Sequence, residues 1–174
     1  MRGYKLQSRL FVPKILIVED EVSLAEVCRA ILNQAGAHAH VIYDGADASA
    51  AIESFKPDVI LSDVKMPDMR GDELLLNLLA DAPHIPTILM SGLQRSGITI
   101  PRDVPNLFSL IYKPLEFDQL IRTVQSAVNL VEAEHLKRML MQELHAQSNQ
   151  AEDFSLWHEK AMSHLIDTWN KRRA

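Results

Sequence analysis

The sequence predicts an α/β domain with a doubly wound, five-stranded parallel sheet, followed by an α-helical extension. Short apolar runs of strand length alternate with segments whose apolar residues recur every three or four positions. Strands joined by helices of this length need right-handed crossovers, which give a parallel sheet covered on both faces. The composition agrees, because 174 residues of which 47% are hydrophobic can bury one core plus a smaller attachment.

The first two thirds of the chain contain the predicted sheet and the helices that cover it. Gly36, Asp44-Gly45 and Lys56-Pro57 mark the ends of the early elements. We expect strands at 14–18, 38–43, 59–62, 87–90 and 108–112, and helices from 24 to near 36, at 46–55 and at 73–80. Residues 92–105 contain two glycines and two prolines, so we expect one or two helical turns at most in that segment.

The pattern after the fifth strand is almost wholly helical. One helix with a continuous apolar face is predicted by Phe117, Leu120, Ile121, Val124, Val128 and Val131. The step from Val131 to Leu136 breaks the heptad phase, which favours a helix that changes face or partner over a simple long coiled coil. We expect a break at Ser148-Asn149, followed by another amphipathic helix that carries both tryptophans.

Acidic residues follow two of the predicted strands, at the sheet edge where open α/β sheets bind ligands. Glu19 and Asp20 come after the apolar run 15–18, and Asp63 comes after the run 59–62. Like charges at about 4 Å cost roughly 1 to 4 kcal/mol per pair, so a cation is expected among them. Mg²⁺ is commonly bound by one or two carboxylates plus a phosphate, which would suit an aspartate that accepts a phosphoryl group.

Each candidate residue also has an ordinary structural explanation. Asp63 could be a solvated loop aspartate, and Glu19 and Asp20 could be acids that favour a helix start through the helix dipole. Two further candidates, Ser91 and Lys113, directly follow the predicted strands 87–90 and 108–112. Ser91 taken alone is more typical of a turn or a cap, and Lys113 taken alone is more typical of a surface lysine. The functional interpretation is favoured because these explanations would all have to coincide.

Four motifs occur in order, each at the end of a predicted strand. They are residues 15–21 (Ile-Leu-Ile-Val-Glu-Asp-Glu), residues 57–67 (Pro-Asp-Val-Ile-Leu-Ser-Asp-Val-Lys-Met-Pro) with Gly71, residues 88–92 (Ile-Leu-Met-Ser-Gly), and residues 113–115 (Lys-Pro-Leu). Together they resemble the receiver domain of two-component response regulators. The resemblance implies a flavodoxin-like receiver fold with strand order 2-1-3-4-5 at residues 12–133, with the helical extension at 134–174.

The resemblance implies a metal site and a phosphorylation site. Asp63 would accept the phosphoryl group, and Glu19 and Asp20 would be the acidic pair that holds Mg²⁺. The metal would also be bound by the carboxylate of Asp63 and by the backbone carbonyl of Lys65.

Two further residues complete the set that the resemblance implies. Ser91 matches the hydroxyl that hydrogen-bonds the phosphoryl oxygen. Lys113 matches the lysine that pairs with the carboxylate and then with the phosphoryl group, and the Lys113–Pro114 peptide bond would be cis. The family's aromatic switch position holds Leu110 here, and a period of two would place Phe108 and Tyr112 on the same strand face.

The composition of the extension bears on the expected partners. Residues 134–174 contain six acidic and six basic residues, so a DNA-binding domain with a basic face is not expected. We expect no DNA contact, and a homodimer or a partner protein docked through these residues. No segment approaches the roughly 20 apolar residues that span a bilayer, so no membrane contact is expected, and the single Cys28 fits a reducing cytoplasm.

We therefore expect a response regulator that takes a phosphoryl group from a sensor histidine kinase or a phosphotransfer protein. We expect it not to be an enzyme, since no P-loop, HExxH or zinc-type spacing occurs. One alternative is a degenerate receiver that acts as a protein-interaction module independent of phosphorylation. Another is an aspartate-nucleophile phosphatase, which the spacing disfavours because Val22 stands two residues after Asp20, where a second acid would be needed.

Overall fold

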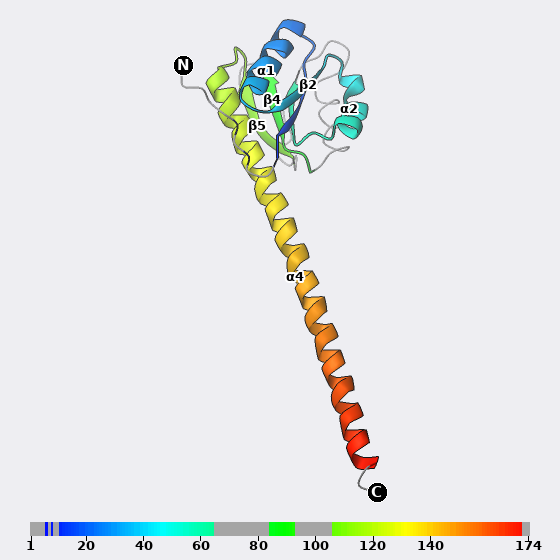
Figure 1. Cartoon of the computed structure of the whole chain (residues 1–174). Coiled ribbons are helices and arrows are strands. Elements are labelled where there is room, and N and C mark those ends of the chain that lie inside the picture. The colour runs from blue at the N-terminus through cyan, green and yellow to red at the C-terminus, as the bar shows by residue number, and fades with distance from the viewer. Residues whose placement is uncertain (1–5, 7, 9–10, 65–83, 93–105, 172–174) are drawn as a thin grey trace. The chain divides into compact units, whose positions relative to one another are not determined.

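Five parallel strands form one sheet in the order β2-β1-β3-β4-β5 (Figure 1). The computed structural model describes residues 6, 8, 11–64, 84–92 and 106–171, with side chains described up to residue 145. The predicted fold class and strand order are confirmed. The strands are β1 (Lys14–Val18), β2 (His38–Ile42), β3 (Val59–Asp63), β4 (Thr87–Ser91) and β5 (Leu107–Tyr112).

Helices cover both faces of this sheet (Figure 1). One face packs against α1 and the first turns of α4, and the other packs against α2. The described helices are α1 (Val22–Gln34), the 3-10 turn η1 (Gly45–Asp47), α2 (Ala48–Phe55) and α4 (Phe117–Lys171). The expected helix at 73–80 lies outside the described residues, as do residues 93–105 of the breaker-rich segment.

Strand β1 shows why the sheet must be covered on both sides. Ile15 and Ile17 face the core cluster that includes α1 and α4, whereas Leu16 and Val18 face the cluster that includes α2. All four side chains are fully buried. A continuous apolar run, rather than an alternating one, is typical of a parallel strand with helices on both faces. The core also includes Leu6, which precedes the predicted boundary at residue 12.

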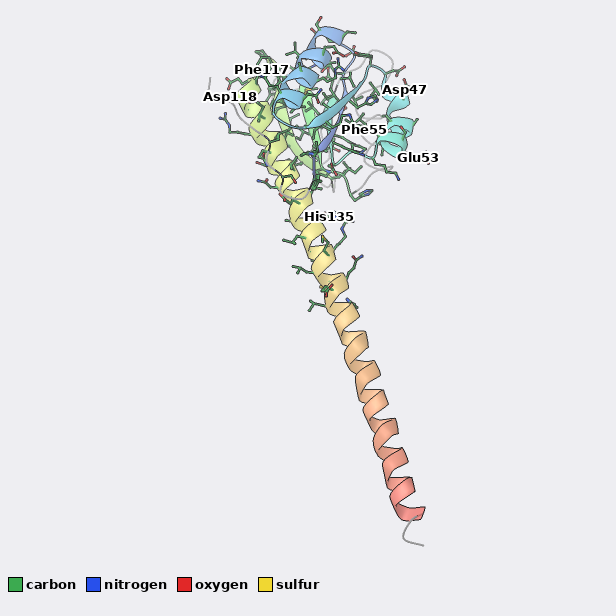
Figure 2. All side chains as sticks on the ribbon, viewed as in Figure 1. Asp47, Glu53, Phe55, Phe117, Asp118 and His135 are labelled. Carbon is green, nitrogen blue, oxygen red and sulfur yellow. The ribbon has the colours of Figure 1, made fainter. Side chains whose placement is uncertain are left out.

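The end of α2 adopts an uncommon backbone conformation. Lys56 follows the helix with φ 53° and ψ 66°, which is the left-handed region, and its N–H donates to the carbonyl of Ile52 at 2.9 Å. Phe55, the last residue of α2, contacts the imidazoles of His38 and His40 on strand β2 (Figure 2). The helix therefore stops on a left-handed residue in the position that glycine usually takes.

Strand β5 corrects the expectation about its aromatic residues. Its pairing with β4 shifts register between Thr87 and Ile88, which pair with Leu107 and Ser109, so Phe108 is an extra residue. Phe108 packs with the cluster on the α1 and α4 side, whereas Leu110 packs against Leu89 in a different cluster. The expectation that Phe108 shares the face of Leu110 was therefore wrong, because a bulge interrupts the period of two.

Helix α4 corrects a second expectation. It begins at Phe117 and Asp118 (Figure 2) and continues to Lys171, so the predicted break at Ser148-Asn149 does not occur. Serine and asparagine each cost only about 0.5 kcal/mol relative to alanine inside a helix, and neither removes a backbone hydrogen bond as proline does.

The chain divides into two compact units, Met1–Glu132 and Ala133–Ala174. The first contains the sheet and the beginning of α4, and the second contains the remainder of that helix. Within the described residues, no helix combines the length and the apolarity needed to cross a membrane.

Candidate functional site

The candidate residues lie at the carboxyl ends of the strands. Glu19 and Asp20 directly follow β1, Asp63 is the last residue of β3, Ser91 is the last residue of β4, and Lys113 directly follows β5. Carboxyl ends of parallel strands meet at one edge of a sheet, where ligands bind in open α/β folds. The described structure therefore brings five of the six predicted site residues to one edge, and Lys65 lies outside the described residues.

Backbone hydrogen bonds extend the sheet into this edge. The N–H of Val64 donates to the carbonyl of Met90 at 2.9 Å, and the N–H of Lys113 donates to the carbonyl of Ser91 at 2.7 Å. These two bonds fix Asp63 and Lys113 against β4 rather than leaving them on free loops. The predicted cis peptide between Lys113 and Pro114 is also present.

Three carboxylates form a compact cluster. One oxygen each from Glu19, Asp20 and Asp63 lies within 4.8 Å of the others. Glu19 is fully buried and Asp63 is 8% exposed, whereas Asp20 is half-buried. Asp20 is therefore the most accessible of the three acids.

Lys113 connects two of these carboxylates. Its Nζ donates to both oxygens of Glu19, at 3.0 and 2.8 Å, and to Oδ2 of Asp63 at 2.6 Å. The lysine is 94 positions from Glu19 and 50 positions from Asp63 in the sequence. Its three hydrogen bonds use all the donors that an ammonium group has.

Burial and hydrogen bonding act in opposite directions on these charges. Burial raises the pKa of the Glu19 carboxyl, and the hydrogen bond from Lys113 only partly opposes this effect. For Lys113, burial lowers the pKa, but the hydrogen bonds to Asp63 and Glu19 and the negative charges of these acids together outweigh burial and leave the pKa above its ordinary value. Lys113 is therefore held as an ammonium ion between the two buried acids.

The donor set fits a small divalent cation. Three carboxylates and one ammonium leave two negative charges when all are ionised, and hard oxygen atoms are the ligands that Mg²⁺ prefers. Lys113 hydrogen-bonds both oxygens of Glu19 and one oxygen of Asp63, and each of these oxygens keeps a further lone pair that can face a metal. Glu19, Asp20 and Asp63 can each offer one oxygen to an ion at this cluster.

The sequence did not indicate how Glu19 and Lys113 pair. The family resemblance suggested Asp63 as the carboxylate partner of Lys113, whereas two of the three Lys113 hydrogen bonds go to Glu19. The sequence carried no signal for this pairing. It is explained by the burial of Glu19 in the structure, because a fully buried carboxylate requires a cation or several hydrogen-bond donors.

Comparison with known proteins decides the family. The family model for the response regulator receiver domain matches residues 15–125 of this chain, a range that contains Glu19, Asp63 and Lys113. The chain belongs to this family. Among solved structures, the receiver domain of a putative LuxO repressor protein from Vibrio parahaemolyticus is 25% identical. The structural match covers 72% of this chain and 97% of the LuxO receiver chain, with a TM-score of 0.65.

Sequence relatives are longer regulators. The chain is 31% identical over 114 residues to the transcriptional regulatory protein ZraR of Salmonella typhimurium, covering 66% of this chain and 26% of that protein. It is 29% identical over 115 residues to the DNA-binding transcriptional regulator NtrC of Escherichia coli, covering 66% and 24%. The chain thus spans about a quarter of the length of the relatives it matches.

The expectation that this protein is not an enzyme was wrong. It depended on the absence of catalytic motifs from 174 residues, but the matching regulators ZraR, NtrC and LuxO extend far beyond the shared segment. The absence of motifs from a receiver segment carries no information about the activities of regulators of this type. The expectation of no DNA contact, by contrast, is not tested, since the match covers the receiver segment alone.

Proposed function

We propose that this receiver takes a phosphoryl group from a sensor histidine kinase or a phosphotransfer protein onto Asp63, with Mg²⁺ as cofactor. The observation that supports this proposal is the position of the Asp63 carboxylate. It lies within 4.8 Å of the carboxylate oxygens of Glu19 and Asp20, and 2.6 Å from the ammonium of Lys113. A carboxylate acceptor, additional acids for a metal and a fixed cation are the groups that phosphoryl transfer requires.

The transfer step involves one bond formed and one bond broken. A carboxylate oxygen of Asp63 attacks the phosphorus atom, and the bond from phosphorus to the imidazole nitrogen of the donor histidine breaks. The nitrogen keeps the electron pair of that bond and takes a proton from solvent. Lys113 stabilises the negative charge on the phosphoryl oxygens, and Ser91 is assigned a hydrogen bond to one of them.

The metal would be held by Glu19, Asp20, Asp63 and the backbone carbonyl of Lys65. When bound, Mg²⁺ would neutralise charge on the phosphoryl group and on the acidic cluster. Lys113 pairs with Glu19 and Asp63, and Asp20 is the least buried acid of the cluster.

We also propose that residues 12–133 act as the receiver and that residues 134–174 relay its state, through a homodimer or a docked partner protein. Leu110 stands at the family's aromatic switch position, so the relay would differ from one that depends on a ring. The proposed setting is the cytoplasm, where histidine kinases act and where Cys28 would stay reduced.

The test is phosphorylation by a small phosphodonor in the presence of Mg²⁺. We expect intact-mass measurements to show one phosphoryl adduct that survives acid and is lost in base. The adduct should be absent from Asp63→Asn and present in Asp44→Asn, a matched control whose side chain caps η1 instead. Absence of the adduct from the wild-type protein would contradict the proposal and favour a module that binds partners without phosphorylation.

A further inference from the structure

Large apolar side chains lie exposed on α4 within the unit Ala133–Ala174. Leu136 is 48% exposed, Leu140 is 55% exposed and Leu144 is 59% exposed. In the described residues of this unit, the continuation of α4 is the only element of regular structure. A single helix has no core of its own, and most helices in proteins are stabilised by packing of an apolar face. These leucines therefore need a surface to cover them.

The exposed leucines form one narrow stripe. Ala133, Leu136, Leu140 and Leu144 follow one another at steps of three, four and four residues. Since successive helical residues are about 100° apart, these four positions lie within about 80° around the helix axis. The eleven residue steps from Ala133 to Leu144 make about three helical turns, so the first and last of these side chains point in nearly the same direction. We call these four residues the α4 stripe.

Charged residues occupy the two sides of the α4 stripe differently. By the same 100° rotation, Glu132 and Glu143 lie on one side of the stripe and Lys137 lies on the other. Glu143 and Lys137 are exposed and Glu132 is half-buried. The charged residues nearest to the stripe are therefore acids on one side and a base on the other.

We propose that the α4 stripe binds the α4 stripe of a second copy of this chain, with the two helices parallel and in register. This dimer would be the relay of the proposed function. Its biological role rests on that function, whereas the association of the two helices does not. In a parallel pair, opposite sides of the two helices meet, so Glu132 of one copy faces Lys137 of the other. The pair thus joins unlike charges across the apolar seam.

The antiparallel arrangement is disfavoured by the same charges. When two α4 stripes run in opposite directions and are centred on one another, the acidic side of each helix meets the acidic side of the other. Glu132 of one copy then lies next to Glu143 of the second copy, and like charges at this position oppose association. Charge complementarity therefore selects the parallel dimer.

The first experiment measures the mass of the full chain in solution by light scattering and sedimentation equilibrium. We expect a dimer whose dissociation constant rises about tenfold or more in Leu140→Glu. The matched variant Gln142→Glu introduces the same charge on the opposite side of the same helix, and it should leave the dissociation constant unchanged. A wild-type protein that stays monomeric at high micromolar concentration, or equal effects of the two variants, would overturn the inference.

The second experiment tests direction and register. In a Cys28→Ala background, mild oxidation should link Leu140→Cys into disulfide dimers, because in a parallel pair each position meets its own copy. Gln142→Cys should stay unlinked. Lys137→Glu should weaken the dimer and Glu132→Lys combined with Lys137→Glu should restore it. Linking of Leu136→Cys to Leu140→Cys in preference to linking of either variant to itself would show an antiparallel pair and overturn the inference.

Failure of this inference and failure of the proposed function give different results. The phosphoryl adduct at Asp63 is measured on the same samples, and Leu140→Glu should form it as the wild type does. A monomeric wild type that still forms the adduct would overturn the dimer and leave the proposed function supported. A parallel dimer without any adduct would support the dimer and contradict the phosphorylation.

Discussion

Lys113 compensates the negative charge of the buried acids in the site. Its ammonium makes hydrogen bonds to Glu19 and Asp63, and Glu19 has no exposed surface. Lys113→Met should lower the free energy of unfolding by about 3 kcal/mol without metal, because it leaves a buried carboxylate without its cation. Denaturant unfolding measures this change. Glu19→Gln combined with Lys113→Met should recover most of the loss, and a single variant as stable as the wild type would contradict the argument.

Asp20 provides the most direct test of metal binding. If Asp20 and Asp63 hold Mg²⁺, the cation at ten times its dissociation constant should stabilise the wild type by about 1.4 kcal/mol. Asp20→Asn should lose most of this stabilisation, whereas Asp44→Asn, which lies outside the acidic cluster, should keep it. Thermal unfolding with Mg²⁺ and with a monovalent salt at equal ionic strength measures the difference. Equal Mg²⁺ responses in the two variants would argue against the site.

Cys28 should be unreactive in the folded protein. It is fully buried in α1, and burial raises the pKa of its thiol to about 11 from an ordinary value of 9.0. Because the folded pKa is the higher one, the stability linked to this group is fully present below pH 9.0 and is lost as pH rises to about 11.

A disulfide reagent at pH 8 should therefore label Cys28 only after unfolding. The chain has a single cysteine, so the absorbance change reports this residue alone. The same protein in guanidinium chloride is the control and should react completely. Labelling of the native protein at the rate of a free thiol would show that the thiol is accessible and that the burial argument fails.

Among the secondary-structure elements, the strands were the most predictable from sequence. Continuous apolar runs such as residues 15–18 fixed the strands and their order of appearance, and strand ends that stop at acids predicted the site. The bulge at Phe108 was not predictable, because the register of β5 is set by its partner β4 and not by its own pattern. The continuity of α4 was missed because Ser148-Asn149 resembles a break in composition but costs little inside a helix.

Lys56 offers a test of backbone strain at the end of α2. Its φ of 53° lies in the left-handed region, which costs roughly 1 to 2 kcal/mol for a residue with a Cβ atom. Lys56→Gly should therefore raise the free energy of unfolding by about 0.5 kcal/mol, after the extra chain entropy of glycine in the unfolded state is subtracted. Lys56→Ala, which keeps the Cβ atom, should give no gain. Denaturant unfolding of both variants decides between them.

For the whole molecule, we expect the two compact units to have separate roles, phosphorylation in the first and association in the second. A chain of residues 1–132 contains Glu19, Asp63 and Lys113, together with the core residues that α4 contributes. We expect it to fold cooperatively, to form the Asp63 adduct with Mg²⁺, and to stay monomeric at concentrations where the full chain should form the proposed dimer. Circular dichroism, intact mass and light scattering measure these three properties. Loss of the adduct on truncation would show that the second unit takes part in the chemistry.

The Lys113 hydrogen bonds have a consequence for newly made protein. Residues that follow β1, end β3 and follow β5 must all be in place before this site exists, and the most distant pair is separated by 94 positions in the sequence. A nascent or partly assembled chain lacks the site, because closing so long a loop comes only with completion of the sheet. An incoming phosphoryl donor would thus modify only chains in which the sheet is complete. Phosphorylation would therefore be restricted to folded molecules.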